Sequence, residues 1–350
     1  MTKYSRELGQ KRKLGWALGA ALAMSWLAAP SPGLAQDQFQ LRWAHYLAAG
    51  PLLEVEEAFA RRVEERTNGR VKFQISYSGG LGSGTEVLAL TGRGGVDLSA
   101  VVPGYYPDQL LYWKASQIPF VFESPREAID VMQMSAKEIP AFTEELEKLG
   151  VHFLFQQPLG SYYLTGPSPD CDTMAGLAGK KIRSYGADIP KLLSTADAVP
   201  ITLGVPELYE ALQRGALDYA LLPLGNTVAY RLSEVGKFTC GPIHSVAGHM
   251  ILMNKRVWDR MPADIQAIMT EEAATAQQEY VAWLERTEET TMKELQAAGG
   301  TIKMFPEAEL AKWKAETPDL LQGWVDEMTE RGQGEAAEKV AESWRKMTAK

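Results

Sequence analysis

Two segments far apart in this chain carry the same succession of residues. The segment TEVLALTGRGGVDLSAVVP spans 85–103, and PELYEALQRGALDYALLP spans 206–223. In each, a glutamate is followed seven residues later by an arginine, which a glycine follows directly, and eleven residues later by an aspartate, Asp97 or Asp218. This order predicts a helix, a glycine stop, a turn at the aspartate and a buried strand. One such match can arise by chance, but matching charges at identical offsets favour a duplicated βα lobe.

Strands and helices alternate elsewhere in the chain too. Residues 71–77 alternate apolar and polar side chains, as a half-buried strand does, and apolar residues at helical spacing run from Pro51 to a stop at Asn68-Gly69. Ser124 and Glu127 form a capping box that opens another helix. We therefore predict an α/β fold with largely parallel sheets. Two similar lobes of this kind would face each other across a cleft, where ligand pockets are favoured.

A long helix is predicted over 262–298, because this stretch has no glycine or proline after its first residue and its apolar side chains recur at helical spacing. At 1.5 Å per residue such a helix would be roughly 50 Å long. Since that exceeds one lobe, we expect it to bridge both. The first lobe is predicted to comprise 36–160 plus about 245–285, and the second 161–244 plus about 286–350.

The first 35 residues have the features of a secretory signal peptide. Basic residues precede an apolar run, 14–29, that is shorter than the ~20 residues of a spanning helix. Small residues then lead to Ala35, after which we expect cleavage and release into the periplasm, without direct membrane insertion. The whole chain has a net charge of −8 and this segment contributes +4, so the remainder carries −12. Such a charge argues against nucleic acid or anionic lipid as a partner.

No motif for catalysis or metal binding stands out in the sequence. There is no nucleophile elbow, His-Glu-x-x-His, Walker loop or Gly-x-Gly-x-x-Gly, and four scattered histidines with two cysteines have no zinc-ligand spacing. An enzyme is therefore the less favoured interpretation. Exported cysteines are often paired. The sequence is consistent both with a disulfide between Cys171 and Cys240 and with two buried free thiols.

Several further fragments, taken in their order, make a resemblance specific. They include AFARRVEERTNGRVKFQISYSGGLGSGTEVL, ASQIPFVFESPREA, LAGKKIR and MNKRVWDRMPADIQ. With the two repeated segments, they resemble the substrate-binding subunits of tripartite ATP-independent periplasmic (TRAP) transporters, the DctP-like family, from about Leu41 to about Phe305. The resemblance implies a bilobal periplasmic-binding-protein fold, with two α/β lobes, hinge strands and a long bridging helix. It also implies a binding protein rather than an enzyme, which captures a small organic acid, uses no cofactor and delivers the acid to a small and a large membrane subunit. One branch of the family binds a metal and carries a Trp-containing acidic segment after the second repeat; DYALLPLGN, residues 218–226, lacks it, so we predict no metal.

The resemblance gives a role to the arginine of GKKIRSYG, residues 179–186. In the family, the arginine of this G-x-K-x-R segment pairs with the ligand carboxylate, and here it is Arg183. A guanidinium is permanently charged and its planar fork matches a carboxylate bidentately. From the residues alone, pairing with nearby Asp188 or an acidic helix is the simpler interpretation.

This sequence departs from the family where other polar contacts would lie. Tyr162 stands where many members have a second arginine, and Leu222 lies in a segment where members often have Glu-Asn-Pro. Tyr46 and Tyr105 align with positions that are often Asn or charged. The candidate substrate-binding residues are Arg183, Tyr46, Tyr105, Tyr162, Leu222, Val205 and His45.

At all of these positions a tyrosine or a leucine replaces the polar residue that is common in the family, and tyrosine offers an apolar ring face with one hydroxyl. We therefore hypothesise a monocarboxylate ligand with an apolar or aromatic body, although each tyrosine taken singly is equally explained by core or hinge packing. An alternative is a periplasmic carboxylate-binding protein of another transport or sensory system. The protein is expected to be a monomer or a homodimer.

Overall fold

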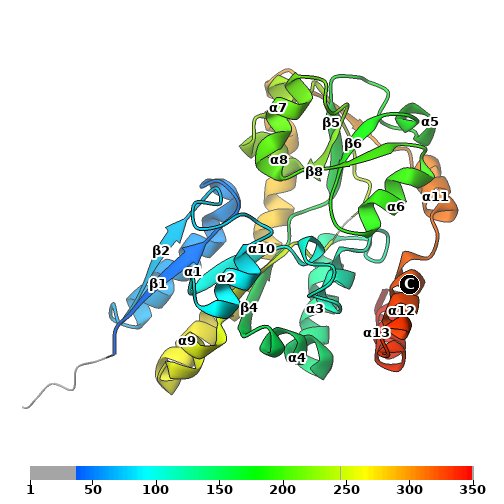
Figure 1. The fold of residues 1–350 in the computed structure, drawn as a ribbon. Coiled ribbons are helices and arrows are strands. Elements are labelled where there is room, and N and C mark those ends of the chain that lie inside the picture. The colour runs from blue at the N-terminus through cyan, green and yellow to red at the C-terminus, as the bar shows by residue number, and fades with distance from the viewer. Residues whose placement is uncertain (1–36, 245, 349–350) are drawn as a thin grey trace, which may run out of the picture. The chain divides into compact units, whose positions relative to one another are not determined.

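The structure is a computed structural model that describes residues 37–244 and 246–348. The predicted signal peptide and its cleavage site after Ala35 lie outside the described residues. From Gln38 onward the chain forms one compact unit, built on two β-sheets that are each covered by helices (Figure 1). Among the described residues, no helix combines the length and apolar character needed to cross a membrane.

The first sheet has five strands in the order β2-β1-β3-β10-β4. Its strands are β1 (Phe39–Ala44), β2 (Val71–Ser76), β3 (Leu98–Val101), β4 (Val151–Gln157) and β10 (His249–Asn254). The helices between them are η1 (Pro51–Leu53), α1 (Glu54–Arg66), α2 (Val87–Arg93), η2 (Pro103–Tyr105), η3 (Trp113–Gln117), α3 (Pro125–Glu138) and α4 (Pro140–Lys148), with α9 (Lys255–Arg260) after β10.

The second sheet has the order β11-β9-β5-β8, and a bridge between Ile182 and Tyr219 joins it to the β6-β7 pair. Its strands are β5 (Tyr162–Gly166), β6 (Lys181–Ser184), β7 (Val199–Thr202), β8 (Ala220–Pro223), β9 (Phe238–Gly241) and β11 (Thr301–Met304). Its helices are α5 (Met174–Leu177), α6 (Asp188–Thr195), η4 (Val205–Glu207), α7 (Leu208–Gln213), α8 (Leu224–Ala229) and η5 (Leu232–Glu234). A disulfide joins Cys171 to Cys240 in the core of this lobe. Of the two possibilities that the sequence allowed, paired cysteines or free thiols, the structure has the pair.

The local signals in the sequence act as expected. The side chains of Val55, Phe59 and Val63 form the buried face of α1, and the chain then turns through Asn68 and Gly69, which have φ values of 53° and 74°. Ser124 caps α3 by accepting a hydrogen bond from the backbone N–H of Glu127 at 3.1 Å. The carboxylate of Glu127 accepts the N–H of Glu123 at 2.6 Å, one residue before the position that a capping box uses, so only the first half of the predicted box forms. The predicted helix and strand types are therefore confirmed in these segments.

The two repeated segments form equivalent structures in the two lobes. Each consists of a short helix, a glycine of positive φ and a buried strand, which are α2, Gly94 and β3 in the first lobe and α7, Gly215 and β8 in the second. The carboxylate of Asp97 accepts the backbone N–H of Arg42 in β1 at 2.8 Å, and that of Asp218 accepts the backbone N–H of Lys181 in β6 at 2.7 Å. The aspartates therefore hold the same place in each lobe.

Neither sheet is as parallel as the pattern predicts. Strand β10 runs antiparallel to β3 and β4, and β5 runs antiparallel to β8 and β9, whereas the remaining pairs are parallel. Both exceptional strands enter their sheet from the other lobe, β5 after residues 158–161 and β10 after residues 246–248. Their direction is therefore determined by the hinge rather than by a βαβ crossover.

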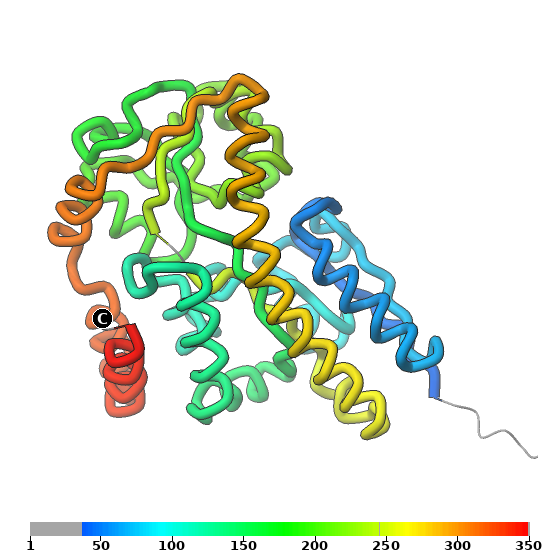
Figure 2. The backbone as a smooth tube through the Cα atoms, turned by 180° about the vertical axis from the view of Figure 1, so that it is seen from behind, coloured from blue at the N-terminus to red at the C-terminus, as the bar shows by residue number. Residues whose placement is uncertain are grey.

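The predicted long helix is α10 (Ala263–Ala297), which begins and ends within a residue of its expected bounds. It contacts α1 and β4 of the first lobe and α8 and β11 of the second, and Figure 2 shows it passing from one group of elements to the other. The expectation that this helix bridges both lobes is confirmed. Its length is about 50 Å at the usual rise per residue.

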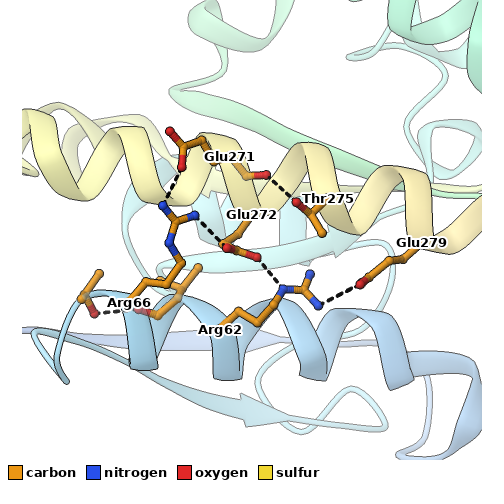
Figure 3. A network of polar contacts seen from close by, with 8 residues as sticks. Arg62, Arg66, Glu271, Glu272, Thr275 and Glu279 are labelled. Carbon is orange, nitrogen blue, oxygen red and sulfur yellow. Dashed lines mark hydrogen bonds and ion pairs between the residues drawn. The ribbon is translucent and has the colours of Figure 1, made fainter.

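An ion-pair network attaches the first half of α10 to α1 (Figure 3). Arg66 bonds Glu272 at 2.8 Å and Glu271 at 2.6 Å, while Arg62 bonds Glu279 at 2.9 Å and also contacts Glu272. The side chain of Glu272 is only 7% exposed and receives both guanidinium groups. Because several charges share one partner, this network orders the helix pair better than isolated surface pairs would.

The end of the chain packs beside the first sheet. After α11 (Glu307–Glu316), the helices α12 (Leu320–Glu330) and α13 (Gly334–Thr348) join the core around α3. Trp344 donates from Nε1 to Ser135 at 2.8 Å, and Lys114 bonds Glu327 at 2.7 Å. The lobe boundaries given above stay a prediction, and a boundary drawn from these contacts would assign 320–348 to the first lobe.

Candidate functional site

Arg183 is held inside the second lobe by three neutral oxygen atoms. It lies in β6, and only 1% of its surface is exposed. Its Nε donates to the carbonyl oxygen of Leu203 and its Nη1 to that of Leu221, each at 3.2 Å, while Nη2 donates to the hydroxyl of Tyr105 at 3.2 Å. A guanidinium has five N–H donors, so these bonds leave one N–H on each terminal nitrogen.

No carboxylate balances Arg183 within the described residues. Asp188, the partner suggested by its proximity in sequence, pairs with Lys191 at 2.9 Å. The other buried cation in the described part of the chain, Lys114, is neutralised by Glu327. Burying an ion without a counter-charge is costly, so the surroundings of Arg183 are suited to an anion.

Aromatic rings surround the guanidinium. The Cζ atom of Arg183 lies 4.6 Å from the ring centroid of Tyr185, and the Tyr185 ring packs against those of Tyr105 at 6.0 Å and Tyr162 at 5.9 Å. Burial raises the pKa of Tyr162 to about 12 and that of Tyr185 well above its ordinary value. These hydroxyls are therefore neutral near pH 7, and the local positive charge belongs to Arg183.

A pocket opens beside these rings. We call it the narrow pocket; its volume is about 20 Å³. The residues that line it are Tyr46, Val102, Tyr105, Leu159, Tyr162, Arg183, Tyr185, Val205, Leu222, Pro223 and Asn226. A larger cleft of about 800 Å³ shares Tyr46, Tyr105, Tyr185 and Val205 with it and is lined by loops of both lobes. The two spaces together can hold a small organic molecule with one end at Arg183.

Strand ends of both sheets bring these residues together. Tyr46 follows β1 and Tyr105 follows β3 in the first lobe, while Arg183 and Leu222 belong to β6 and β8 in the second. In α/β folds, ligand sites form at the carboxyl ends of parallel strands, and the repeated segments supply one such end to each side of the pocket.

Six of the seven predicted site residues line the narrow pocket, and His45 is the exception. Its ring stacks behind Tyr46, with centroids 5.5 Å apart, and its Nε2 lies 3.1 Å from Glu56. The sequence reasoning missed Tyr185, which lies one position past the end of β6; its place two residues after Arg183 is the spacing that puts side chains of an extended chain on one side. It also missed Asn226, whose buried Oδ1 has no hydrogen-bond partner in the described residues.

Comparison with known proteins places this chain in a family. The family model for bacterial extracellular solute-binding protein, family 7 (DctP), matches residues 47–328. The C4-dicarboxylate-binding periplasmic protein DctP of Rhodobacter capsulatus is 26% identical over 325 residues, which cover 91% of this chain and 95% of that protein.

Solved structures share the fold at low sequence identity. A TRAP periplasmic solute-binding protein of Chromohalobacter salexigens with bound D-glucuronate has a TM-score of 0.79 and 19% identity, covering 88% of this chain and 99% of that one. A marine metagenome TRAP solute-binding protein from an unidentified microbe, specific for aromatic acids and bound to metahydroxyphenylacetate, has a TM-score of 0.77 and 21% identity, covering 89% and 100%. Since the family model spans most of the chain, the protein belongs to the DctP family of TRAP periplasmic solute-binding proteins, which bind their solutes without catalysis.

Proposed function

We propose that this protein is the extracytoplasmic subunit of a TRAP-type secondary transporter that captures a small organic acid through Arg183. The observation that carries the proposal is a buried guanidinium without a carboxylate partner in the described residues, with one N–H left on each terminal nitrogen. A carboxylate accepts two parallel bonds from such a fork. The loaded protein would pass its ligand to a small and a large membrane subunit.

The lining of the pocket favours a monocarboxylate with an apolar or aromatic body. Arg183 is the single cation among the residues that line the narrow pocket, and Tyr105, Tyr162, Val205 and Leu222 supply aromatic and aliphatic surface. A second carboxylate would have no cation to meet it there. Relatives of this chain bind dicarboxylates, uronates and aromatic acids, so the choice among these classes rests on the pocket.

The remaining parts of the proposal follow from the sequence. The chain would be exported to the periplasm with cleavage after about Ala35 and would work without metal or cofactor. Its lobes would meet near residues 158–161 and 246–248, between the strands of the two sheets.

A carboxylate-binding protein of another transport or sensory system is the second candidate, since it would need the same pocket but different partners. The genes adjacent to this one separate the two. A TRAP system requires a small and a large membrane subunit there, and their absence would favour the second candidate.

A thermal-shift screen with aromatic, branched and C4 acids tests the ligand and Arg183 together. A ligand at 100 times its Kd stabilises the native state by about 2.7 kcal/mol, so tight monocarboxylates should raise the melting temperature clearly. Arg183→Gln should abolish the shift, and Arg183→Lys should weaken it because an ammonium lacks the planar fork. Arg214→Ala, which removes an exposed arginine paired with Glu210, is the matched control and should leave the shift intact.

Two results would contradict the proposal. One is unchanged affinity in a folded Arg183→Gln protein, as judged by circular dichroism. The other is tighter binding of succinate or malate than of aromatic and branched monocarboxylates, which would overturn the ligand class alone.

A further inference from the structure

A buried polar network lies directly behind Tyr46. The carboxylate of Glu56 in α1 is 2.8 Å from Nε2 of His249 in β10, 3.1 Å from Nε2 of His45 and 2.9 Å from the hydroxyl of Tyr280 in α10. The other ring nitrogen of His249, Nδ1, is 3.1 Å from the hydroxyl of Tyr46. Each of these side chains is almost completely buried, so its hydrogen bonds determine which atoms carry protons.

The protons on His45 are fixed by the backbone. The N–H of Leu47 donates to Nδ1 of His45 at 3.0 Å, so this nitrogen must present a lone pair. A neutral imidazole then carries its proton on Nε2, which faces Glu56. One possible metal-ligand atom from each of His45, Glu56 and His249 lies within 4.8 Å of the other two, a spacing that would also allow a metal ion to bind. Because Nε2 of His45 is protonated, however, it has no lone pair for a cation, and a close polar contact between this N–H and the Glu56 carboxylate, short of an aligned hydrogen bond, is the better account.

The protons on His249 follow from Glu56. Burial alone would raise the pKa of this carboxyl, but the two histidines outweigh it and lower the pKa to about 2, so Glu56 is an anion that only accepts. Nε2 of His249 therefore carries a proton and donates to it. Burial lowers the pKa of His249, which keeps the ring neutral and leaves a lone pair on Nδ1. The hydroxyl of Tyr46 must then donate its proton to Nδ1.

We propose that this network makes the Tyr46 hydroxyl an acceptor towards the pocket, so that the preferred ligand carries a hydroxyl or N–H donor that Tyr46 can receive. With its proton committed to His249, the phenol oxygen has only lone pairs left to offer. Tyr46 lines both the narrow pocket and the larger cleft, on the first-lobe side of the space that Arg183 faces. The inference rests on the proposed function, because Arg183 must first anchor the carboxylate. It narrows the ligand class to hydroxy- or amino-substituted monocarboxylates.

The alternative state of the network is costly. A ligand that presents only an acceptor to Tyr46 would need the hydroxyl proton, and His249 would then have to take up a second proton on Nδ1. The titratable groups that face this ring are Glu56, His45 and Tyr46. His45 cannot share that proton, since its Nδ1 is occupied by the backbone.

Titration calorimetry with matched acids tests whether the hydroxyl of Tyr46 accepts a hydrogen bond from the ligand. The probes are phenylacetate with its 2-, 3- and 4-hydroxy derivatives, and 3-methylbutyrate with 2-hydroxy-3-methylbutyrate. We expect at least one hydroxy acid to bind about ten-fold more tightly than its parent, as one added hydrogen bond allows. Tyr46→Phe should remove that gain, so that the hydroxy acid binds no more tightly than its parent.

The inference is wrong if the acids bind in an Arg183-dependent way but no hydroxy acid binds more tightly than its parent. It is also wrong if the Tyr46→Phe protein still binds the hydroxy acid about ten-fold more tightly. If none of these acids binds in an Arg183-dependent way, the proposed function itself fails, and the inference falls with it.

Glu56→Gln tests whether the network acts through Tyr46. The glutamine amide can accept from His45 and donate to Nε2 of His249, which lets His249 carry its proton on Nδ1 and donate to Tyr46 instead. The hydroxyl of Tyr46 is then free to donate, so the ten-fold preference should shrink to less than about two-fold. Loss of structure alone would weaken parent and hydroxy acid equally.

Glu57→Gln is the matched control. Glu57 lies next to Glu56 on α1 and accepts from the hydroxyl of Tyr77 at 2.8 Å, and neither of these two residues lines the narrow pocket or the larger cleft. It should keep the wild-type preference. A preference that survives in a folded Glu56→Gln protein would refute the role of the network.

Discussion

Arg183 shows how a single charged residue can be kept buried and ready for a ligand. Two backbone carbonyl groups and one phenol hydroxyl satisfy some of its N–H donors, and the ring of Tyr185 lies against the guanidinium. These contacts lower the cost of burial without neutralising the charge. A carboxylate that enters therefore gains a charge-assisted bond to a side chain that is already ordered.

Buried histidines make the stability of this protein sensitive to acid. Burial lowers the pKa of His244 to about 3, and the ring stacks on Tyr162 with centroids 4.7 Å apart. Its folded pKa lies below the unfolded value, so below about pH 6.5 the unfolded chain binds a proton that the folded protein does not. The free energy of unfolding should therefore fall by about 1.4 kcal/mol per pH unit for this residue as the pH drops from about 6 to about 4.

Urea unfolding across that pH range checks this prediction. His244→Phe keeps a ring against Tyr162 but removes the titrating group. The slope of the free energy of unfolding against pH should therefore decrease by the contribution of one proton, about 1.4 kcal/mol per pH unit. An identical slope in the two proteins would show that His244 does not titrate in this way.

At the scale of elements, the hinge depends on a glycine that cannot be replaced. Gly248 directly precedes β10, with φ at +78°, and a Cβ there would lie 1.8 Å from the carbonyl oxygen of Gln157 at the end of β4. Both the backbone conformation and the close approach exclude a side chain.

Gly248→Ala should lower the free energy of unfolding by more than about 2 kcal/mol, measured by urea denaturation. Gly323→Ala is the control, because Gly323 lies inside α12 and a Cβ added there would have no neighbouring atom within 4 Å. There the gain in helix propensity should raise stability by about 0.5–1 kcal/mol. A Gly248→Ala protein as stable as the wild type would mean that the crossing between the lobes can shift to admit the methyl group.

At the scale of the whole molecule, the charge of the protein opposes the charge of the proposed ligand. The chain after residue 35 carries −12, while the narrow pocket holds the cation Arg183. The long-range field should therefore repel an organic anion, and salt should screen that repulsion.

We expect the association rate of a carboxylate to rise about two-fold from low to physiological ionic strength, as measured by stopped-flow tryptophan fluorescence. A neutral amide analogue of the same acid is the control and should show no such change. A rate that falls with salt would mean that the local field of Arg183 outweighs the net charge.

Most of the fold could be predicted from the sequence because its signals are local. Capping residues, glycine stops and apolar spacing are set by neighbours within a few positions, and they located α1, α3 and α10 closely. The direction of β5 and β10 could not be predicted in this way, because it depends on where the chain crosses between the lobes.

The sequence by itself determined the duplicated helix–glycine–strand unit, the long helix and, through the family resemblance, the arginine that the proposed ligand would meet. Only the tertiary structure decided that Arg183 has no carboxylate partner in the described residues and that Cys171 and Cys240 are joined. It also decided that His249 lies between Tyr46 and Glu56, although 203 positions separate His249 from Tyr46 in the chain. The physical reason is that a buried charge or hydrogen bond depends on every group around it, and those groups come from strands and helices that no local pattern connects.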